Sequence, residues 1–433
     1  MLPGLPLFIA PAVQQLPLPE GSTDDYSMSV DDVRGSEEFA FQTTDTVGLR
    51  MQLREGSGGL AGQLVRVLDH NDGVVLFQAV TDGDGVAAGN FTINKTVRQV
   101  AVEFTGGQVA YQVPVDLDDV LSVERTVTFF GQNDSQLART ALRNVLADID
   151  GDGVPDAADH FPEDPTRATR LHFPSRGRYT VAFEDLYPVK GDADFNDYVA
   201  QVRFVEELSA TGDVVRLRAS IRHVARAAGY KHFLRLGLDG FTEAAYTIKR
   251  FNPEGDLVDE SSAVAPEFRD VALTARSDRT ISQSNARRNQ KFEAGDLFEL
   301  EVTPGTAVSK DTLGGAPYDL HIYVQTTKRE VRFAGREKAR QGEDLNLDED
   351  GFPWALLVPV DWRWMLERKN IHEAYVRVDD WYTSDGRVNR DWYNDPDLSL
   401  VFANTSTYMS SAPTFAPPPG FPGGDFVIEE SFQ

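Results

Sequence analysis

The 433-residue sequence contains no cysteine, which excludes disulfide frameworks, thiolate zinc sites and cysteine nucleophiles. Long apolar segments are missing as well. The longest apolar stretch near the start, residues 5–13, is broken by Pro6 and Pro11 and is too short to span a bilayer as a helix. Ala10 and Ala12 give a small-x-small cleavage pattern, but no lysine or arginine precedes them, so an intact signal peptide is not supported. We therefore expect no transmembrane segment.

Positive charge is scarce. Lysine and arginine number 42 against 68 aspartates and glutamates, which gives a formal net charge of −26. Such a surface repels phosphate backbones, so nucleic-acid binding is excluded as a function class. The same charge suits cation binding and solubility outside the cell, with self-repulsion as the cost. The hydrophobic share of 41 % is that of a globular protein.

Familiar catalytic motifs are missing too. None of the seven histidines belongs to an HExxH pair, and there is neither a phosphate loop ending in GK[ST] nor a GxSxG nucleophile elbow. A carboxylate pair for glycoside hydrolysis stays open, because 68 acidic residues offer many pairs. The densest acids, however, have the spacing of metal ligands. We therefore predict that the protein is not an enzyme.

Short runs of alternating apolar and polar residues recur between turn signals, which predicts a mostly β fold. Apolar residues at helical spacing predict one helix at 135–146. We divide the chain into five parts: an extended arm (1–35), an immunoglobulin-like β-sandwich (36–132), a linker with the helix and a calcium loop (133–170), a larger sandwich-type β-domain (171–405) and an extended Pro/Gly-rich tail (406–433).

Residues 148–159 have the spacing of a twelve-residue calcium loop. Alternate side chains of such a tight loop turn inward, and Gly153 allows the sharp bend. The predicted ligands are five carboxylates and one backbone carbonyl: Asp148, Asp150, Asp152, Val154, Asp156 and Asp159. Pro155 lacks the N–H that a paired EF-hand uses, so the loop resembles the free-standing type of thrombospondin type 3 repeats. The alternative is a solvated acidic turn.

A second acidic segment lies at residues 183–198. Its oxygen-bearing side chains are again spaced at two, and like charges this crowded would repel without a cation. We predict a second calcium site with six candidate ligands: Glu184, Asp185, Asp192, Asp194, Asn196 and Asp197. The alternative is an ion-pair network with Lys190 or nearby arginines. A third acidic stretch, residues 343–351, is looser and is predicted to be a solvated loop.

These motifs also carry a family resemblance. DIDGDGVPDAADHFPEDPTRA at 148–168, TVAFEDLYPVKGDADFNDYV at 180–199, GFPWALLV at 351–358 and WYNDP at 392–396 resemble the LruC-domain family of bacterial exported or outer-membrane-associated proteins. The resemblance covers about residues 145–403. It implies calcium loops and an extracellular, cell-surface or periplasmic location, and it implies no established activity.

All five tryptophans fall within residues 354–392: Trp354, Trp362, Trp364, Trp381 and Trp392. We predict that these rings fill a core, because bulky aromatic side chains usually pack inside. In the alternative, Trp362, Trp364, Trp381 and Trp392 form an exposed platform that stacks on sugar rings.

The sequence thus predicts a calcium-binding structural or adhesive protein of the bacterial surface. Its partners would be cell-surface components or further copies of itself. Self-assembly is predicted because residues 2–20 and 410–433 are long arms with scattered apolar side chains, and such segments can add a strand to a neighbour's sheet. The alternative function is a carbohydrate-binding surface protein that uses the tryptophans, with calcium purely structural.

Overall fold

The computed structural model describes residues 14–15, 26–30, 41–106, 109–117, 120–129, 147–227, 229–287, 294–336, 344–349, 351–359 and 362–402. Across these residues the chain is mostly β, with several antiparallel sheets and a few short helices, which confirms the predicted fold class. The helix expected at 135–146 and the tail from 406 onward lie outside the described residues, as does most of the N-terminal arm. No described helix has both the length and the apolar content needed to cross a bilayer.

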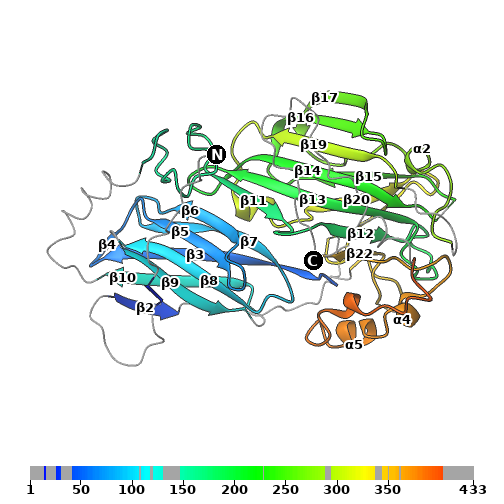
Figure 1. Ribbon diagram of the computed structural model, residues 1–433, viewed down its shortest axis with the longest axis horizontal. Helices are drawn as coiled ribbons and strands as arrows, with labels where there is room; N and C mark the ends of the chain where they lie inside the picture. The colour runs from blue at the N-terminus through cyan, green and yellow to red at the C-terminus, as the bar shows by residue number, and fades with distance from the viewer. Residues whose placement is uncertain are drawn as a thin grey trace, which may run out of the picture.

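Two five-stranded sheets form the N-terminal sandwich, drawn in blue and cyan in Figure 1. Along its central strand, apolar side chains alternate with polar ones, so Val47, Leu49 and Met51 are buried while Arg50 is exposed. One sheet has the order β1 (Gln14–Gln15), β9 (Val109–Asp116), β8 (Gln99–Gly106), β5 (Leu64–Asp69) and β6 (Val75–Val80). The other comprises β2 (Tyr26–Val30), β10 (Ser122–Phe129), β3 (Thr44–Glu55), β4 (Gly58–Gly59) and β7 (Val86–Asn94), which pairs with β3.

Two pieces of the expected N-terminal arm belong to this sandwich. Strand β1 pairs in parallel with β9, and β2 pairs antiparallel with β10. The arm was predicted to be extended, with a segment able to add a strand to the edge of a neighbour's sheet. At these two segments it adds a strand to each sheet of its own chain, where the main-chain hydrogen bonds of an edge strand are available.

A larger pair of sheets makes up the second half, in green and yellow in Figure 1. The eight-stranded sheet has the order β17 (Leu257–Glu267), β16 (Thr242–Phe251), β19 (Leu297–Thr303), β14 (Val214–Ala225), β13 (Tyr198–Leu208), β12 (Tyr179–Phe183) and β22 (Ala355–Val358), with β11 (Thr169–Phe173) also on β13. The four-stranded sheet has the order β18 (Val271–Ala272), β15 (His232–Gly237), β20 (Asp319–Val324) and β21 (Arg329–Val331). Their facing side chains, such as Val202, Leu234 and Ile322, form one fully buried core.

The opposite face of β12 and β22 carries a layer of short helices, orange in Figure 1: α4 (Ile371–Ala374), α5 (Val378–Thr383) and the 3-10 turn η1 (Trp392–Asn394). Because successive side chains of a strand point to opposite faces, Leu357 enters the core between the sheets while Leu356 and Val358 enter the core under the helices. Two further short helices, α2 (Ser277–Thr280) and α3 (Lys310–Leu313), lie in loops of the larger domain.

The sandwich packs directly against the larger domain. The Asn90 side chain on β7 donates to the backbone oxygen of Lys310 over 2.6 Å, and the N–H of Val80 on β6 donates to Ala210 (3.0 Å). Phe41, just before β3, is buried against Phe352 with ring centroids 5.7 Å apart. The two halves therefore share buried hydrogen bonds and apolar contacts.

Candidate metal centres

Residues 148–159 fold into the tight turn that their spacing predicts. Backbone N–H groups donate to the carboxylates, from Gly151 to Asp148 Oδ1 (2.8 Å) and from Val154 to Asp152 Oδ1 (2.7 Å). Gly151 and Gly153 have φ values of 78° and 99°, in the left-handed region that favours glycine. The turn thus bends the chain back and brings three of its acidic side chains together.

Three of these carboxylates meet. One oxygen each from Asp148, Asp150 and Asp152 lies within 4.8 Å of the other two, close enough to share one cation. Oδ2 of Asp150, Asp152 and Asp159 is buried and accepts no hydrogen bond. Buried carboxylate oxygens without a donor are costly, so the group formed by Asp148, Asp150 and Asp152 could hold a metal ion.

The electrostatics of the loop agree with this. Burial, together with the neighbouring Asp152 and Asp150, raises the pKa of Asp159 to about 6, and burial also raises the pKa of Asp152. Asp156 is a further electrostatic neighbour of Asp159, and its Oδ1 accepts from the N–H of Ile149 (2.9 Å). Of the predicted ligands, Val154 has a buried side chain, 1 % exposed, which anchors the end of the turn.

Two paired strands, β12 and β13, bring the two ends of the second acidic segment together. Phe183, the last residue of β12, is opposite Tyr198, the first residue of β13. The residues just beyond these strand ends, Glu184 and Asp197, therefore lie at the same end of the β12–β13 pair. Between them the loop turns through Phe195, whose φ is 44° and whose buried ring packs under the helical layer.

Glu184, Asp192 and Asp194 form the second carboxylate triplet, again with one oxygen of each within 4.8 Å of the others. Glu184 is 3 % exposed. Its Oε1 accepts from the N–H of Phe195 (2.6 Å), and its Oε2 has no hydrogen-bond partner. Asp194 Oδ2 accepts from the N–H of Arg368 (2.7 Å), which ties the loop before α4 to the site. The triplet can hold a metal ion.

The other three predicted ligands have different roles. Asp197 Oδ2 accepts from the N–H of Asp185 (3.0 Å), and the side chain of Asn196 donates to the backbone of Met365 (3.1 Å). Asp185 Oδ2 is 2.9 Å from His232 Nε2. The structure thus brings Glu184, Asp192 and Asp194 together and places these three around them.

His232 is a residue that the sequence did not single out, because it lies on β15, far along the chain. Burial lowers its pKa to about 3, so the ring is neutral. Its Nε2–H therefore donates to Asp185, and Nδ1, 3.1 Å from Ser277 Oγ, accepts. Ser277 and His232 are both fully buried, so this Ser–His–Asp arrangement orients Asp185 and is closed to a substrate.

Excess negative charge dominates this centre. Burial, followed by neighbouring carboxylates, raises the pKa of Asp194 to about 8 and that of Asp185 to about 7. Burial and the same neighbours raise the pKa values of Glu184 and Asp197 well above the usual range. A cation would remove the repulsion.

The second half of the chain resembles a known family. Residues 212–393 match a family model described as a domain of unknown function, DUF4842. The match runs from β14 to η1 and leaves both acidic segments outside it. No curated protein matches the chain. Among solved structures, a "Putative lipoprotein" from Bacteroides ovatus is similar with 14 % identity and a TM-score of 0.44, covering 78 % of this chain and 98 % of that one. The Bacillus anthracis TIE protein matches at 8 % identity and a TM-score of 0.15, over 68 % of this chain and 48 % of that one.

A third group of possible ligands lies outside the predicted sites, and an arginine side chain forms ion pairs with its carboxylates. Asp270, Asp319 and His321 have ligand atoms within 4.8 Å of one another. The guanidinium of Arg332 forms ion pairs with both Asp270 (3.2 Å) and Asp319. Because the arginine neutralises these carboxylates, we do not assign a metal to this group.

The looser acidic stretch near residue 348 is a hydrogen-bonded turn. Asp348 Oδ1 accepts from the N–H of Phe352 (2.8 Å), and Asp344 Oδ1 accepts from that of Asn346 (2.9 Å). Its carboxylates therefore satisfy backbone donors of their own loop. Residues 343 and 350 lie outside the described part of the chain.

The tryptophans are buried. The exposed fractions are at most 3 % for Trp354, Trp362, Trp364, Trp381 and Trp392. Trp381 and Trp392 pack with ring centroids 5.5 Å apart in the core beneath α4 and α5. The alternative of an exposed platform is therefore not supported, because no ring presents a face on which a sugar could stack.

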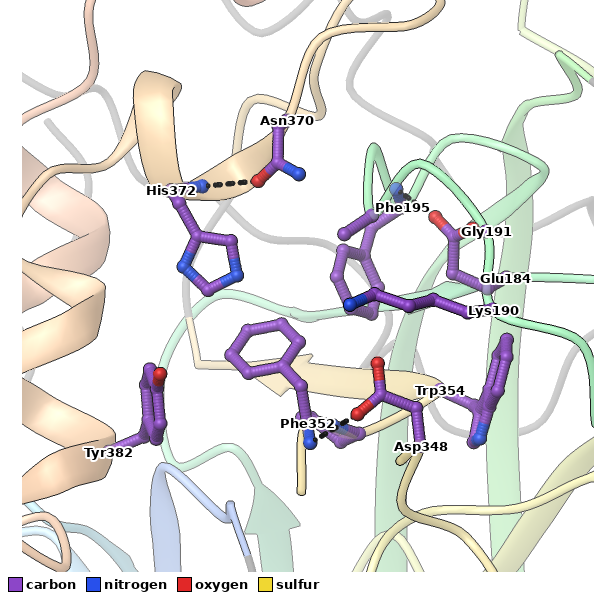
Figure 2. A pocket seen from close by; sticks show the side chains of 12 residues that line it. Glu184, Lys190, Gly191, Phe195, Asp348, Phe352, Trp354, Asn370, His372 and Tyr382 are labelled. Carbon is purple, nitrogen blue, oxygen red and sulfur yellow. Dashed lines mark hydrogen bonds between the residues drawn. The ribbon is translucent and has the colours of Figure 1, made fainter. Parts of the chain in front are cut away.

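A cavity of about 330 Å³ adjoins the second centre. Figure 2 shows it between the acidic loop, the turn around Phe352 and helices α4 and α5. Glu184 lies in its wall, together with Lys190, Asp348 and His372. The carboxylate that belongs to the metal triplet thus also lines this cavity.

Proposed function

We propose that this chain is a calcium-stabilised structural protein of the bacterial cell surface or periplasm, of the LruC type that its motifs resemble. One observation carries the proposal: two separate carboxylate triplets both contain buried oxygens that no donor satisfies. Acidic loops that are merely solvated do not bury such oxygens. The charge of −26 fits a chain that functions with bound cations.

Calcium fits the donors better than other common metals. It takes six to eight oxygen ligands and tolerates irregular geometry, whereas zinc prefers nitrogen and sulfur. Both triplets offer carboxylate oxygens, and the chain has no cysteine. In the second centre the nearby His232 is directed at Asp185 and Ser277, so oxygen remains the donor type.

The positions of the two centres suggest what calcium does. The first loop leads into β11 and rests on the sandwich, because the side chain of Gln78 on β6 donates to Ala158 (2.9 Å) and Thr169 (3.0 Å). A cation there would hold the connection between the two halves. The second centre would clamp the end of the β12–β13 pair to the segment around Arg368 that precedes α4.

The experiment is thermal unfolding with calcium, with magnesium and with excess chelator. We expect calcium to raise the melting temperature, since a ligand at 100 times its Kd stabilises by about 2.7 kcal/mol. The variants Asp150→Asn/Asp152→Asn and Asp192→Asn/Asp194→Asn should each lose part of the rise. Asp259→Asn/Glu260→Gln on the exposed strand β17 removes the same charge and should retain all of it. An equal response in every variant would refute both centres.

We further propose that the protein acts by assembly or adhesion and not by catalysis. Carboxylates that bind a cation stay ionised and are poor proton donors. The arms at 2–20 and 410–433 remain the proposed assembly segments, and the edge pairing of β1 and β2 supports strand addition as their mode. Calcium-dependent growth in particle size that survives deletion of residues 410–433 would refute a role for the tail.

A further inference from the structure

The cavity beside the second centre is built by segments far apart in the sequence. Lys190, Gly191 and Ala193 come from the acidic loop, and Phe352 and Trp354 from the turn into β22. His372 and Tyr382 come from α4 and α5. Its 330 Å³ falls at the small end of ligand pockets, which start at about 300 Å³. A space this size fits a single ring.

One wall of the cavity contains a buried carboxylate with an oxygen that accepts no hydrogen bond. Glu184 is 3 % exposed and its Oε2 has no partner. A Cβ added at Gly191 would lie 2.5 Å from this oxygen, so glycine at this position lets the loop pack closely against the carboxylate. Figure 2 shows Glu184 beside Gly191 and Lys190 at the cavity edge.

Hydrogen-bond donors lie across from this carboxylate. His372 Nδ1 is bonded to Asp379, which leaves Nε2 on the side of the ring that points into the cavity in Figure 2. Asn370 uses its Oδ1 to accept from the N–H of His372 (2.9 Å), and its amide nitrogen remains a donor. The Lys190 amine reaches between these groups and Asp348.

Aromatic rings close the remaining side. Phe352 is packed against His372 with centroids 4.7 Å apart and against Tyr382 at 5.3 Å. Apolar ring surface next to clustered donors and acceptors suits a ligand with one apolar face and a polar rim.

We propose that this cavity binds one neutral pyranose ring through its hydroxyl groups, in a calcium-dependent manner. Glu184 and Asp348 disfavour an anionic ligand and Lys190 a cationic one. Hydroxyl groups both donate and accept, so they match carboxylate, amine, amide and imidazole together. The inference rests on the proposed function, because Glu184 belongs both to the metal triplet and to the cavity wall. The ring can be a free monosaccharide or the terminal residue of a glycan.

Saturation-transfer NMR with a panel of free pyranoses tests the inference on the full chain. In millimolar calcium, at least one sugar should receive saturation, and excess chelator should abolish the transfer. Lys190→Gln/Asp348→Asn should weaken the Kd at least tenfold while leaving the calcium-induced rise in melting temperature intact. His372→Gln serves as a second, partly exposed cavity variant, and Arg269→Gln as a surface control.

The outcomes separate this inference from the proposed function. A rise in melting temperature, with neither transfer to any free sugar nor signal from a glycan array in calcium, overturns the pyranose site and leaves the calcium centres standing. Transfer that persists in chelator, or that is unchanged in Lys190→Gln/Asp348→Asn, also overturns it. A glycan array in calcium distinguishes the sources: signal only from terminal pyranoses on chains, without transfer to free sugars, assigns the site to glycan ends.

Discussion

Glu184 Oε2 lies directly beneath Gly191, at a distance that a Cβ on residue 191 would reduce to 2.5 Å. The contact involves a carboxylate that is itself held by the N–H of Phe195, so it cannot simply swing away. We expect Gly191→Ala to displace the carboxylate and to cost about 1–3 kcal/mol, as overpacking does. Calcium titrations followed by chemical unfolding measure both effects.

A matched control exists for this substitution. A Cβ at Gly229 would meet nothing within 4 Å, so Gly229→Ala should leave calcium affinity and stability unchanged. If Gly191→Ala binds calcium at the second centre as tightly as the parent chain does, the close packing of Gly191 against Glu184 has no role in the site.

Lys310 and Glu206 form a fully buried pair below the sandwich, with Nζ 2.7 Å from Oε1. Tyr318 donates to the same oxygen over 2.7 Å. Lys310→Met should destabilise the protein by about 3–5 kcal/mol, because it leaves a buried carboxylate without its cation. Adding Glu206→Gln should recover much of this loss in urea unfolding. A double variant as unstable as the single one would show that packing, and not charge, sets the cost.

Calcium should remove the fall in stability that the metal-free protein shows as the pH rises. Without metal, the folded-state pKa values of Asp194, about 8, and Asp185, about 7, exceed the ordinary 3.8 of an unfolded aspartate. Between these limits the folded state binds more protons, so the free energy of unfolding falls as the pH rises toward 8. Calcium keeps the carboxylates ionised when folded, so with calcium bound the stability stays level in this range and falls only as the pH decreases through the ordinary pKa of 3.8.

Melting temperatures across this range, with calcium and with chelator, check the prediction. Asp192→Asn/Asp194→Asn should flatten both curves, since it removes two of the interacting carboxylates. Parallel curves with and without calcium would contradict it.

Trp381 and Trp392 pack together with no exposed surface. Trp381→Ala should therefore cost about 3–5 kcal/mol as a cavity-forming core substitution. Near-ultraviolet circular dichroism and chemical unfolding would show the loss. If the variant is as stable as the parent chain and loses only glycan binding, the rings act as a binding surface after all.

Local patterns in the sequence predicted much of the fold. Alternation along residues 47–53 predicted a strand with one buried face, because successive side chains of a strand point to opposite sides. The spacing of residues 148–159, with glycine where φ is positive, predicted the turn and its converging carboxylates, since a loop this tight is governed by its own backbone. The excess of acidic over basic residues likewise predicted that the protein binds cations.

Only the tertiary structure decided which of the six candidate ligands at 184–197 converge. Strand register places Glu184 opposite Asp197, and contacts with His232 and Met365 direct Asp185 and Asn196 elsewhere. The cavity, with His372 and Phe352 beside Glu184, has no local signature at all. Packing sets such relationships between distant segments, because the free energy of burying a whole surface chooses the partners of each side chain. A spacing pattern can specify a turn, but it cannot specify what that turn will face.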